Sequence, residues 1–163
     1  MNKIHGDLQN FQSLSLDWDA YMDLFAPILS PIKALNLAKH DLALAPHWKP
    51  LQQTKFVNEG TTTLADISVW RSGCLLLTKT AAEVLEPFLN DCGELLPLAS
   101  GEVEAYLFNC LLTKPLEEAQ STDIFKSSPS MGIDLYCSDR FKKAVEDSSL
   151  SGIYFTKDLT TLA

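Results

Sequence analysis

The hydrophobic and polar positions in the second half of the chain repeat one pattern. Residues 73–98 follow the order apolar strand, threonine cap, amphipathic helix and apolar strand. Residues 132–155 repeat this order, with Ser138 as the expected helix cap and Gly152 as the expected helix stop. This order is typical of a strand–helix–strand unit. We therefore predict two such units, at 73–98 and 132–155.

Each unit has further detail in its side chains. Residues 74–77 are apolar on both alternating faces, which is typical of a strand in the centre of a sheet. The helix that follows is expected to be capped by Thr78 or Thr80 and kinked by Pro87 in its last turn. The buried faces of the two helices are predicted to carry Ala81, Val84, Leu85, Phe88 and Leu89 in the first unit and Phe141, Ala144 and Val145 in the second.

A short turn at 100–102 joins the strand at 94–98 to an alternating strand at 103–108. Strands joined so closely pair antiparallel, so the sheet cannot be wholly parallel. The predicted fold is α+β, with a mixed, largely antiparallel sheet, packed helices and the two units described above.

The N-terminal third has a different character. Apolar residues at helical spacing follow a Ser15 or Asp17 cap, and Pro27 is expected to end or bend this helix. A second short helix is expected after Pro31, and a proline-broken loop around Trp48 then leads into a short strand. The length of 163 residues fits one domain, with residues 1–60 as a variable helical part and residues 66–155 as the α+β core.

The net charge of −8 changes the choice of partner. Such a field repels phosphate backbones and anionic lipid, so we expect neither nucleic acid nor a membrane as a partner. It favours a basic protein partner, or serves solubility alone. The chain shows no export signal or membrane-spanning run, and its four cysteines have no CxxC spacing, so a reduced cytoplasmic protein is expected.

The sequence offers little catalytic chemistry. No phosphate-binding loop, zinc-protease motif or nucleophile elbow occurs, and the three histidines lack ligand spacing, so we predict no catalytic residue, metal or cofactor. A pair of Cys74 or Cys137 with His47 is a weaker alternative, because only spatial proximity would activate a thiol. Glu102 and Glu104 share a strand face, and a solvated face explains them better than a paired-carboxylate site.

Two aromatic segments are candidates for protein binding. Trp18 and Tyr21 alternate with Asp19 and Asp23, as in an interface rich in hot-spot residues, although an ordinary amphipathic helix that buries its aromatic residues explains the spacing as well. Trp48 lies between two prolines, where a tryptophan is often partly exposed. Both segments lie in the N-terminal third.

Residues 66–155 also carry a family resemblance. The matching pieces are, in order, Asp66, Trp70 to Gly73 with LLLT, Ala81 or Ala82 with Leu85, GELLPL at 93–98, Tyr106 with Phe108-Asn109, residues 124–126, and CSDRFKKAVEDSSLSGIYF at 137–155. In this order the chain resembles a family of immunity proteins from bacterial polymorphic-toxin and contact-dependent competition loci. It departs from the family between Ser121 and Ile124, where relatives carry a longer insertion, and over its first sixty residues.

The resemblance implies a cytoplasmic antidote, not an enzyme, that binds and neutralises a cognate toxin, which we expect to be basic. The candidate contact residues are Trp18, Asp19, Asp23, Trp48, Glu102 and Glu104. Two alternatives remain open: a small cytoplasmic enzyme that uses a thiol or carboxylate, and an adaptor that forms a homodimer through an exposed sheet edge.

Overall fold

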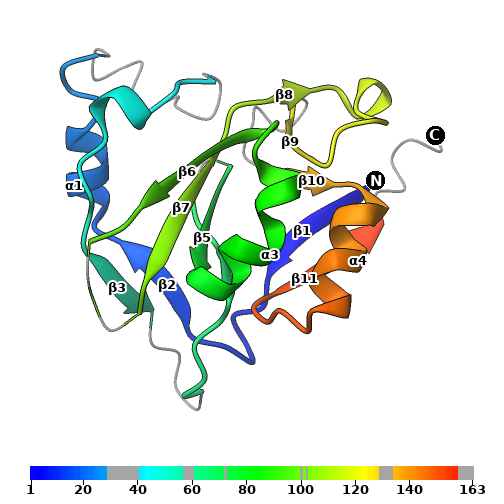
Figure 1. Ribbon diagram of the computed structural model, residues 1–163, viewed down its shortest axis with the longest axis horizontal. Helices are drawn as coiled ribbons and strands as arrows, with labels where there is room; N and C mark the ends of the chain where they lie inside the picture. The colour runs from blue at the N-terminus through cyan, green and yellow to red at the C-terminus, as the bar shows by residue number, and fades with distance from the viewer. Residues whose placement is uncertain are drawn as a thin grey trace.

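The fold is α+β with mixed, largely antiparallel sheets, as the sequence predicts (Figure 1). The computed structural model describes residues 1–28, 41–56, 61–71, 73–99, 101, 103–128 and 134–157. Their strands form a four-stranded sheet, a five-stranded sheet and a two-stranded ribbon.

The first strand–helix–strand unit builds the four-stranded sheet. Strand β5 (Cys74–Thr78) leads through helix α3 (Lys79–Leu89) to strand β6 (Gly93–Pro97). Strand β7 (Ala105–Cys110) lies between β5 and β6 and is antiparallel to both, so β5 and β6 run parallel to one another. Strand β4 (Ile67–Val69) pairs with the other edge of β5. The central place of β5 and the antiparallel β6–β7 hairpin are both confirmed.

The second unit repeats this plan in the five-stranded sheet. Strand β10 (Leu135–Cys137) leads through helix α4 (Asp139–Asp147) to strand β11 (Ile153–Lys157). Strand β1 (Asn2–Gly6) lies between them and is antiparallel to both. Beyond β10 the sheet continues with β9 (Ile124–Ser127) and the short β8 (Thr113–Lys114), which is parallel to β9.

The described residues among the first sixty, 1–28 and 41–56, are mainly extended, whereas the prediction for this part was helical. They include β1 and a ribbon of β2 (Ser13–Leu16) with β3 (Gln53–Phe56), of which only the strand near residue 56 was expected. Helix α1 (Trp18–Asp23) is short and ends before Pro27. The helix predicted after Pro31 lies outside the described residues. Two 3-10 turns complete the described elements: η2 (Ala45–His47) and η3 (Leu116–Glu118).

The helix ends confirm the predicted N-terminal caps but not the predicted stop of α4. The side chains of Asp17, Thr78 and Ser138 cap α1, α3 and α4. Gly152 is not the stop of α4, because Ser149 adopts the left-handed conformation there, with φ 52°. Gly152, with φ 103°, instead lies against β4, where a Cβ atom would come within 2.1 Å of the Ile67 carbonyl oxygen.

The two faces of the four-stranded sheet support two separate cores. Leu75 and Leu77 of β5 face α3 and α4, whose Phe88 and Phe141 rings meet edge to face at 6.1 Å. Cys74 and Leu76 point to the other face, where α1 and the segment before β3 pack. Helices α1 and α3 therefore lie on opposite sides of this sheet (Figure 1).

Candidate protein-binding surface

A groove of about 570 Å³ lies between α1 and the segment that follows residue 41. Its walls include Asp23, Leu24, Pro27, His47, Trp48, Lys49 and Leu51. We call it the Trp48 groove. Because residues 45–51 form one wall without belonging to a sheet, the position of this wall depends on other contacts.

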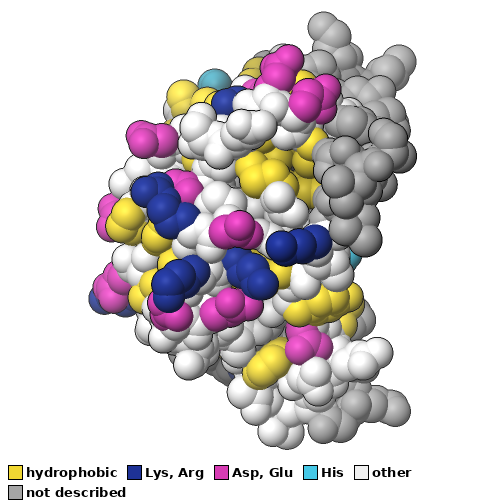
Figure 2. All heavy atoms as spheres, turned by 90° about the vertical axis from the view of Figure 1, so that its right-hand side faces the viewer, with side chains coloured by type: hydrophobic (Ala, Val, Ile, Leu, Met, Phe, Trp, Pro, Cys, Tyr) yellow, Lys and Arg dark blue, Asp and Glu magenta, His cyan; other side chains and the backbone are white. Residues whose placement is uncertain are grey.

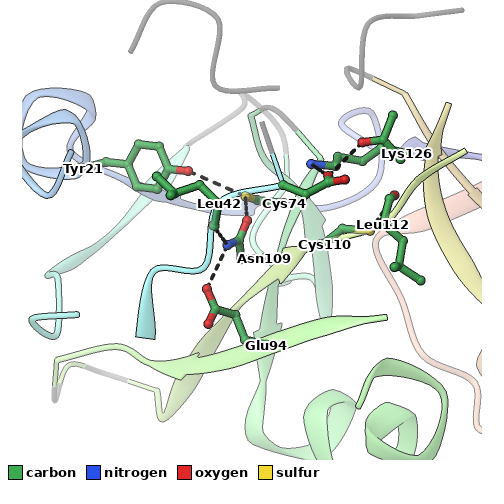
Figure 3. A network of polar contacts seen from close by, with 10 residues as sticks. Tyr21, Leu42, Cys74, Glu94, Asn109, Cys110, Leu112 and Lys126 are labelled. Carbon is green, nitrogen blue, oxygen red and sulfur yellow. Dashed lines mark hydrogen bonds and ion pairs between the residues drawn. The ribbon is translucent and has the colours of Figure 1, made fainter. Parts of the chain in front are cut away.

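Glu94 and Asn109 fix the start of this wall (Figure 3). The Glu94 carboxylate accepts hydrogen bonds from the backbone N–H groups of Leu44 and Ala45, the second at 3.1 Å. The Asn109 side-chain amide donates to the same carboxylate at 2.9 Å and to the Leu42 carbonyl oxygen at 3.0 Å. Side chains of β6 and β7 thus replace the hydrogen bonds that a sheet would give this segment.

Lys126 of β9 adds a charged contact to the same segment (Figure 3). Its side chain is only 2% exposed, and its ammonium nitrogen lies 2.8 Å from Asp41 Oδ1. The Thr113 hydroxyl donates to this carboxylate oxygen at 2.8 Å. A buried cation needs such a partner, so the pair ties Asp41 to the five-stranded sheet. We call Glu94, Asn109 and Lys126 together the polar clamp.

Trp48 is held at its polar end and leaves part of its ring for the groove. The indole Nε1–H donates to the Pro97 carbonyl oxygen at 2.7 Å, and the ring is half-buried against the core beneath α1. Three residues on, the Leu51 carbonyl oxygen accepts from the backbone N–H of Ala99 at 2.9 Å. The tryptophan is therefore oriented before any partner arrives.

The structure brings together only two of the six predicted contact residues. Asp23 and Trp48 both line the Trp48 groove, and Asp23 is exposed. Asp19 is exposed on α1 but is not part of the groove wall. Trp18 lines a different groove, described below. Glu104 lies 3.5 Å from the Lys79 ammonium group and accepts a hydrogen bond from the Tyr106 hydroxyl, and Glu102 lies outside the described residues.

The four cysteine thiols are buried in the hydrophobic cores. All four cysteines are free and buried. Burial raises the pKa of Cys74 to about 11 and that of Cys110 to about 12, and it also raises the pKa values of Cys92 and Cys137. Thiols with such pKa values are neutral at pH 7 and poor nucleophiles.

Cys74 belongs to the polar network beneath the clamp. Its thiol lies 3.8 Å from the Tyr21 hydroxyl and donates to Asn109 Oδ1 at 3.9 Å (Figure 3). His47, the base considered for a thiol pair, is exposed at the rim of the Trp48 groove. An exposed imidazole and a buried thiol do not have the mutual hydrogen bond that activates a nucleophile.

Sequence reasoning missed the polar clamp. Its three members share one signal, which is a charged or amide side chain that interrupts an apolar run: Glu94 in GELLPL, Asn109 in YLFNC and Lys126 after Ile124 and Phe125. A buried polar side chain must find partners, so such an interruption points to a specific contact. The pattern does not reveal which segment supplies that contact.

The surface over α4 has no patch of a single charge. Basic and acidic side chains alternate there (Figure 2). Three ion pairs involve cations of α4: Arg140 with Asp123, Lys142 with Glu146, and Lys143 with Asp147. Within the described ranges, no three His, Cys, Asp or Glu side chains cluster in a way that could hold a metal ion. In the same part of the chain, no helix has the length and apolar character needed to span a bilayer.

Comparisons with protein-family models, with curated proteins and with solved structures find no match to this chain.

Proposed function

We propose that this protein binds a cognate protein toxin at the Trp48 groove and neutralises it by covering part of its surface. The observation that carries the proposal is the groove itself, where an oriented indole on a wall fixed by polar contacts and an exposed carboxylate of α1 line the same hollow. The resemblance of residues 66–155 to immunity proteins supports the class of partner.

The arrangement suits tight binding for a physical reason. Ordering a flexible loop at an interface weakens binding, and a wall already held by the polar clamp avoids most of that cost. Trp48 offers a large ring of the kind that dominates interface hot spots. Asp23 offers a negative group to a basic partner.

The positions of the clamp residues and of the contact residues along the chain also support the proposal. The clamp residues lie in the part of the chain with the family resemblance, whereas Asp23 and Trp48 lie in the first sixty residues, which do not share it. A common scaffold that positions variable contact residues is what a set of antidotes with different partners requires. The proposal involves no catalytic step, and the burial of the four thiols is consistent with that.

The decisive experiment is co-expression with the C-terminal domain of the toxin that the proposal expects beside this gene. Cells that induce the toxin domain are expected to survive only when this protein is present, and the two proteins are expected to co-purify. Equal killing with and without this protein, together with no complex on co-purification, would overturn the proposal and favour the adaptor or enzyme alternatives.

Variants locate the contact. Trp48→Ala should weaken the complex by at least 2 kcal/mol, roughly thirtyfold in Kd. Asp23→Asn should weaken it slightly and reduce the slowing of association by salt. Asp19→Asn is the matched control, because it removes an exposed carboxylate from the same helix outside the groove. If Asp19→Asn has the larger effect, the toxin binds elsewhere on α1.

A further inference from the structure

A second groove lies beside Trp18, the first residue of α1. It has a volume of about 520 Å³, and its walls include Lys3, Trp18, Val69, Trp70, Arg71 and Asp134. We call it the Trp70 groove. Helix α1 contributes Trp18 to this groove and Asp23 and Leu24 to the Trp48 groove, so the two surfaces are separate.

The most exposed large apolar side chains of the described residues gather at the Trp70 groove. They are Leu8, Val69 and Tyr154, which are 48%, 36% and 50% exposed. Val69 lines the groove, and the Tyr154 ring stacks at 4.9 Å on His5, which also lines it. Leu8 and Val69 both adjoin Gly6, since a Cβ placed there would lie 4.0 Å from Leu8 Cδ2 and 3.7 Å from Val69 Cβ. Exposed apolar groups gathered in this way mark interaction sites.

Arg71 supplies an oriented cation at the same place. Its guanidinium carbon lies 4.5 Å from the centre of the Trp18 ring, which holds the group by a cation–π contact. No carboxylate of the described residues pairs with Arg71, whereas the neighbouring Lys3 is paired with Asp134 at 2.9 Å. The planar fork of a guanidinium binds carboxylates in a bidentate manner.

The local charge therefore opposes that of the chain. The groove presents two cations and one carboxylate, Lys3 and Arg71 against Asp134, on a protein whose net charge is −8. Tyrosine, tryptophan and arginine are also the residues enriched at interface hot spots. The Trp48 groove has no such excess of cations, because Asp23 and Lys49 both line it.

We propose that the Trp70 groove binds an acidic peptide segment of a partner protein. A carboxylate of that segment pairs with Arg71, and apolar side chains beside it cover Val69 and pack against the exposed part of the Trp70 ring. The proposal is independent of toxin binding, because it rests on a different groove with different lining residues.

A displayed library of random peptides tests the proposal. The library is selected on the full-length protein, after removal of peptides that bind the Arg71→Gln variant. Enriched peptides are expected to carry Asp or Glu within a few positions of an aromatic or large aliphatic residue. Their affinity should fall at least tenfold on Arg71→Gln and decrease as salt rises. Lys143→Gln is the matched control, since it removes an exposed cation of α4 that does not line the groove and should leave affinity unchanged.

Three results would overturn the proposal. The first is enrichment of peptides without acidic residues, and the second is no enrichment over the counter-selected variant. The third is self-association in sedimentation experiments that Arg71→Gln abolishes, because the groove would then be occupied by a second copy of this chain. Arg71 is exposed, so an unchanged melting temperature of Arg71→Gln will show that the variant tests the surface and not the fold.

Discussion

Lys126 and Asp41 form an ion pair at 2.8 Å in which the cation is buried and the carboxylate is partly open to solvent. The two partners are therefore not equivalent. Loss of the carboxylate leaves a buried cation without its counter-charge, whereas loss of the cation leaves a carboxylate that water can still reach. The asymmetry makes this contact a sensitive test of the polar clamp.

Asp41→Ala is expected to lower the free energy of unfolding by about 2–3 kcal/mol, less than for a fully buried pair because Asp41 is partly exposed. Lys126→Met should cost less, since it replaces the buried cation by an apolar chain of similar length. Urea unfolding of the two variants and of the double variant measures this. A larger loss for Lys126→Met than for Asp41→Ala would contradict the proposed asymmetry.

Glu94→Gln should loosen the wall of the Trp48 groove. The variant keeps the size of the side chain but removes the charge that accepts from Leu44, Ala45 and Asn109. Hydrogen bonds to a charged group contribute about 1.5–3 kcal/mol each, so amide hydrogen exchange at Leu44 and Ala45 should accelerate by at least tenfold. Glu86→Gln, at an exposed position of α3, is the control and should leave both amides unchanged.

Gly152→Ala should destabilise the protein by about 2–4 kcal/mol, because the new Cβ meets the Ile67 carbonyl oxygen and the left-handed backbone is strained for alanine. Gly6→Ala makes only ordinary contacts, with Val69 Cβ at 3.7 Å, and should change stability by less than about 1 kcal/mol. Thermal unfolding of both variants measures the difference. Similar melting temperatures would show that the contact between Gly152 and β4 is not as tight as described.

The buried thiols predict a loss of stability at alkaline pH. The folded-state pKa of Cys110, about 12, lies above that of an unfolded chain, so the unfolded state releases its proton first as the pH rises. This contribution is fully present below about pH 8.5 and decreases between that value and about pH 12. Cys74 acts in the same direction up to about pH 11.

For Cys110 alone the expected loss at pH 10.5 is about 3 kcal/mol. Urea unfolding between pH 7 and 10.5 gives the slope of stability against pH, and Cys110→Ala should reduce that slope although it lowers stability at neutral pH. Identical slopes for the two proteins would mean that this thiol titrates alike in the folded and unfolded states.

The predictable part of the fold lies where side-chain periodicity is unbroken. The face of α3 that carries Leu85 and the cap at Ser138 were both found from spacing alone. Strand β1 was missed because Asn2 occupies an inward position and donates to Asp139, so the strand lacks a regular apolar alternation. Its pairing with β10 and β11 is also a contact between distant parts of the chain, and local pattern contains no information about it.

The candidate site was predictable only as separate residues. Residue type and sequence context made Asp23 and Trp48 candidates. No local pattern indicated that these two residues line one groove, or that Glu104 lies outside it. Their placement depends on Glu94, Asn109 and Lys126, each of which reaches a segment more than forty residues earlier in the chain. A buried polar residue signals that it needs a partner, but the fold alone determines which partner it meets.

The position of β1 also sets an order of events during synthesis. The ribosome makes β1 before both of its neighbours, and its Asn2 pairs with Lys157 at the far end of the described chain. β1 therefore stays unpaired while the four-stranded sheet and α3 are synthesised. Contacts of such long sequence separation slow folding, so closure of the five-stranded sheet should be the late step. Until β11 arrives, the N-terminal strand is open to other strands, including those of a neighbouring nascent chain.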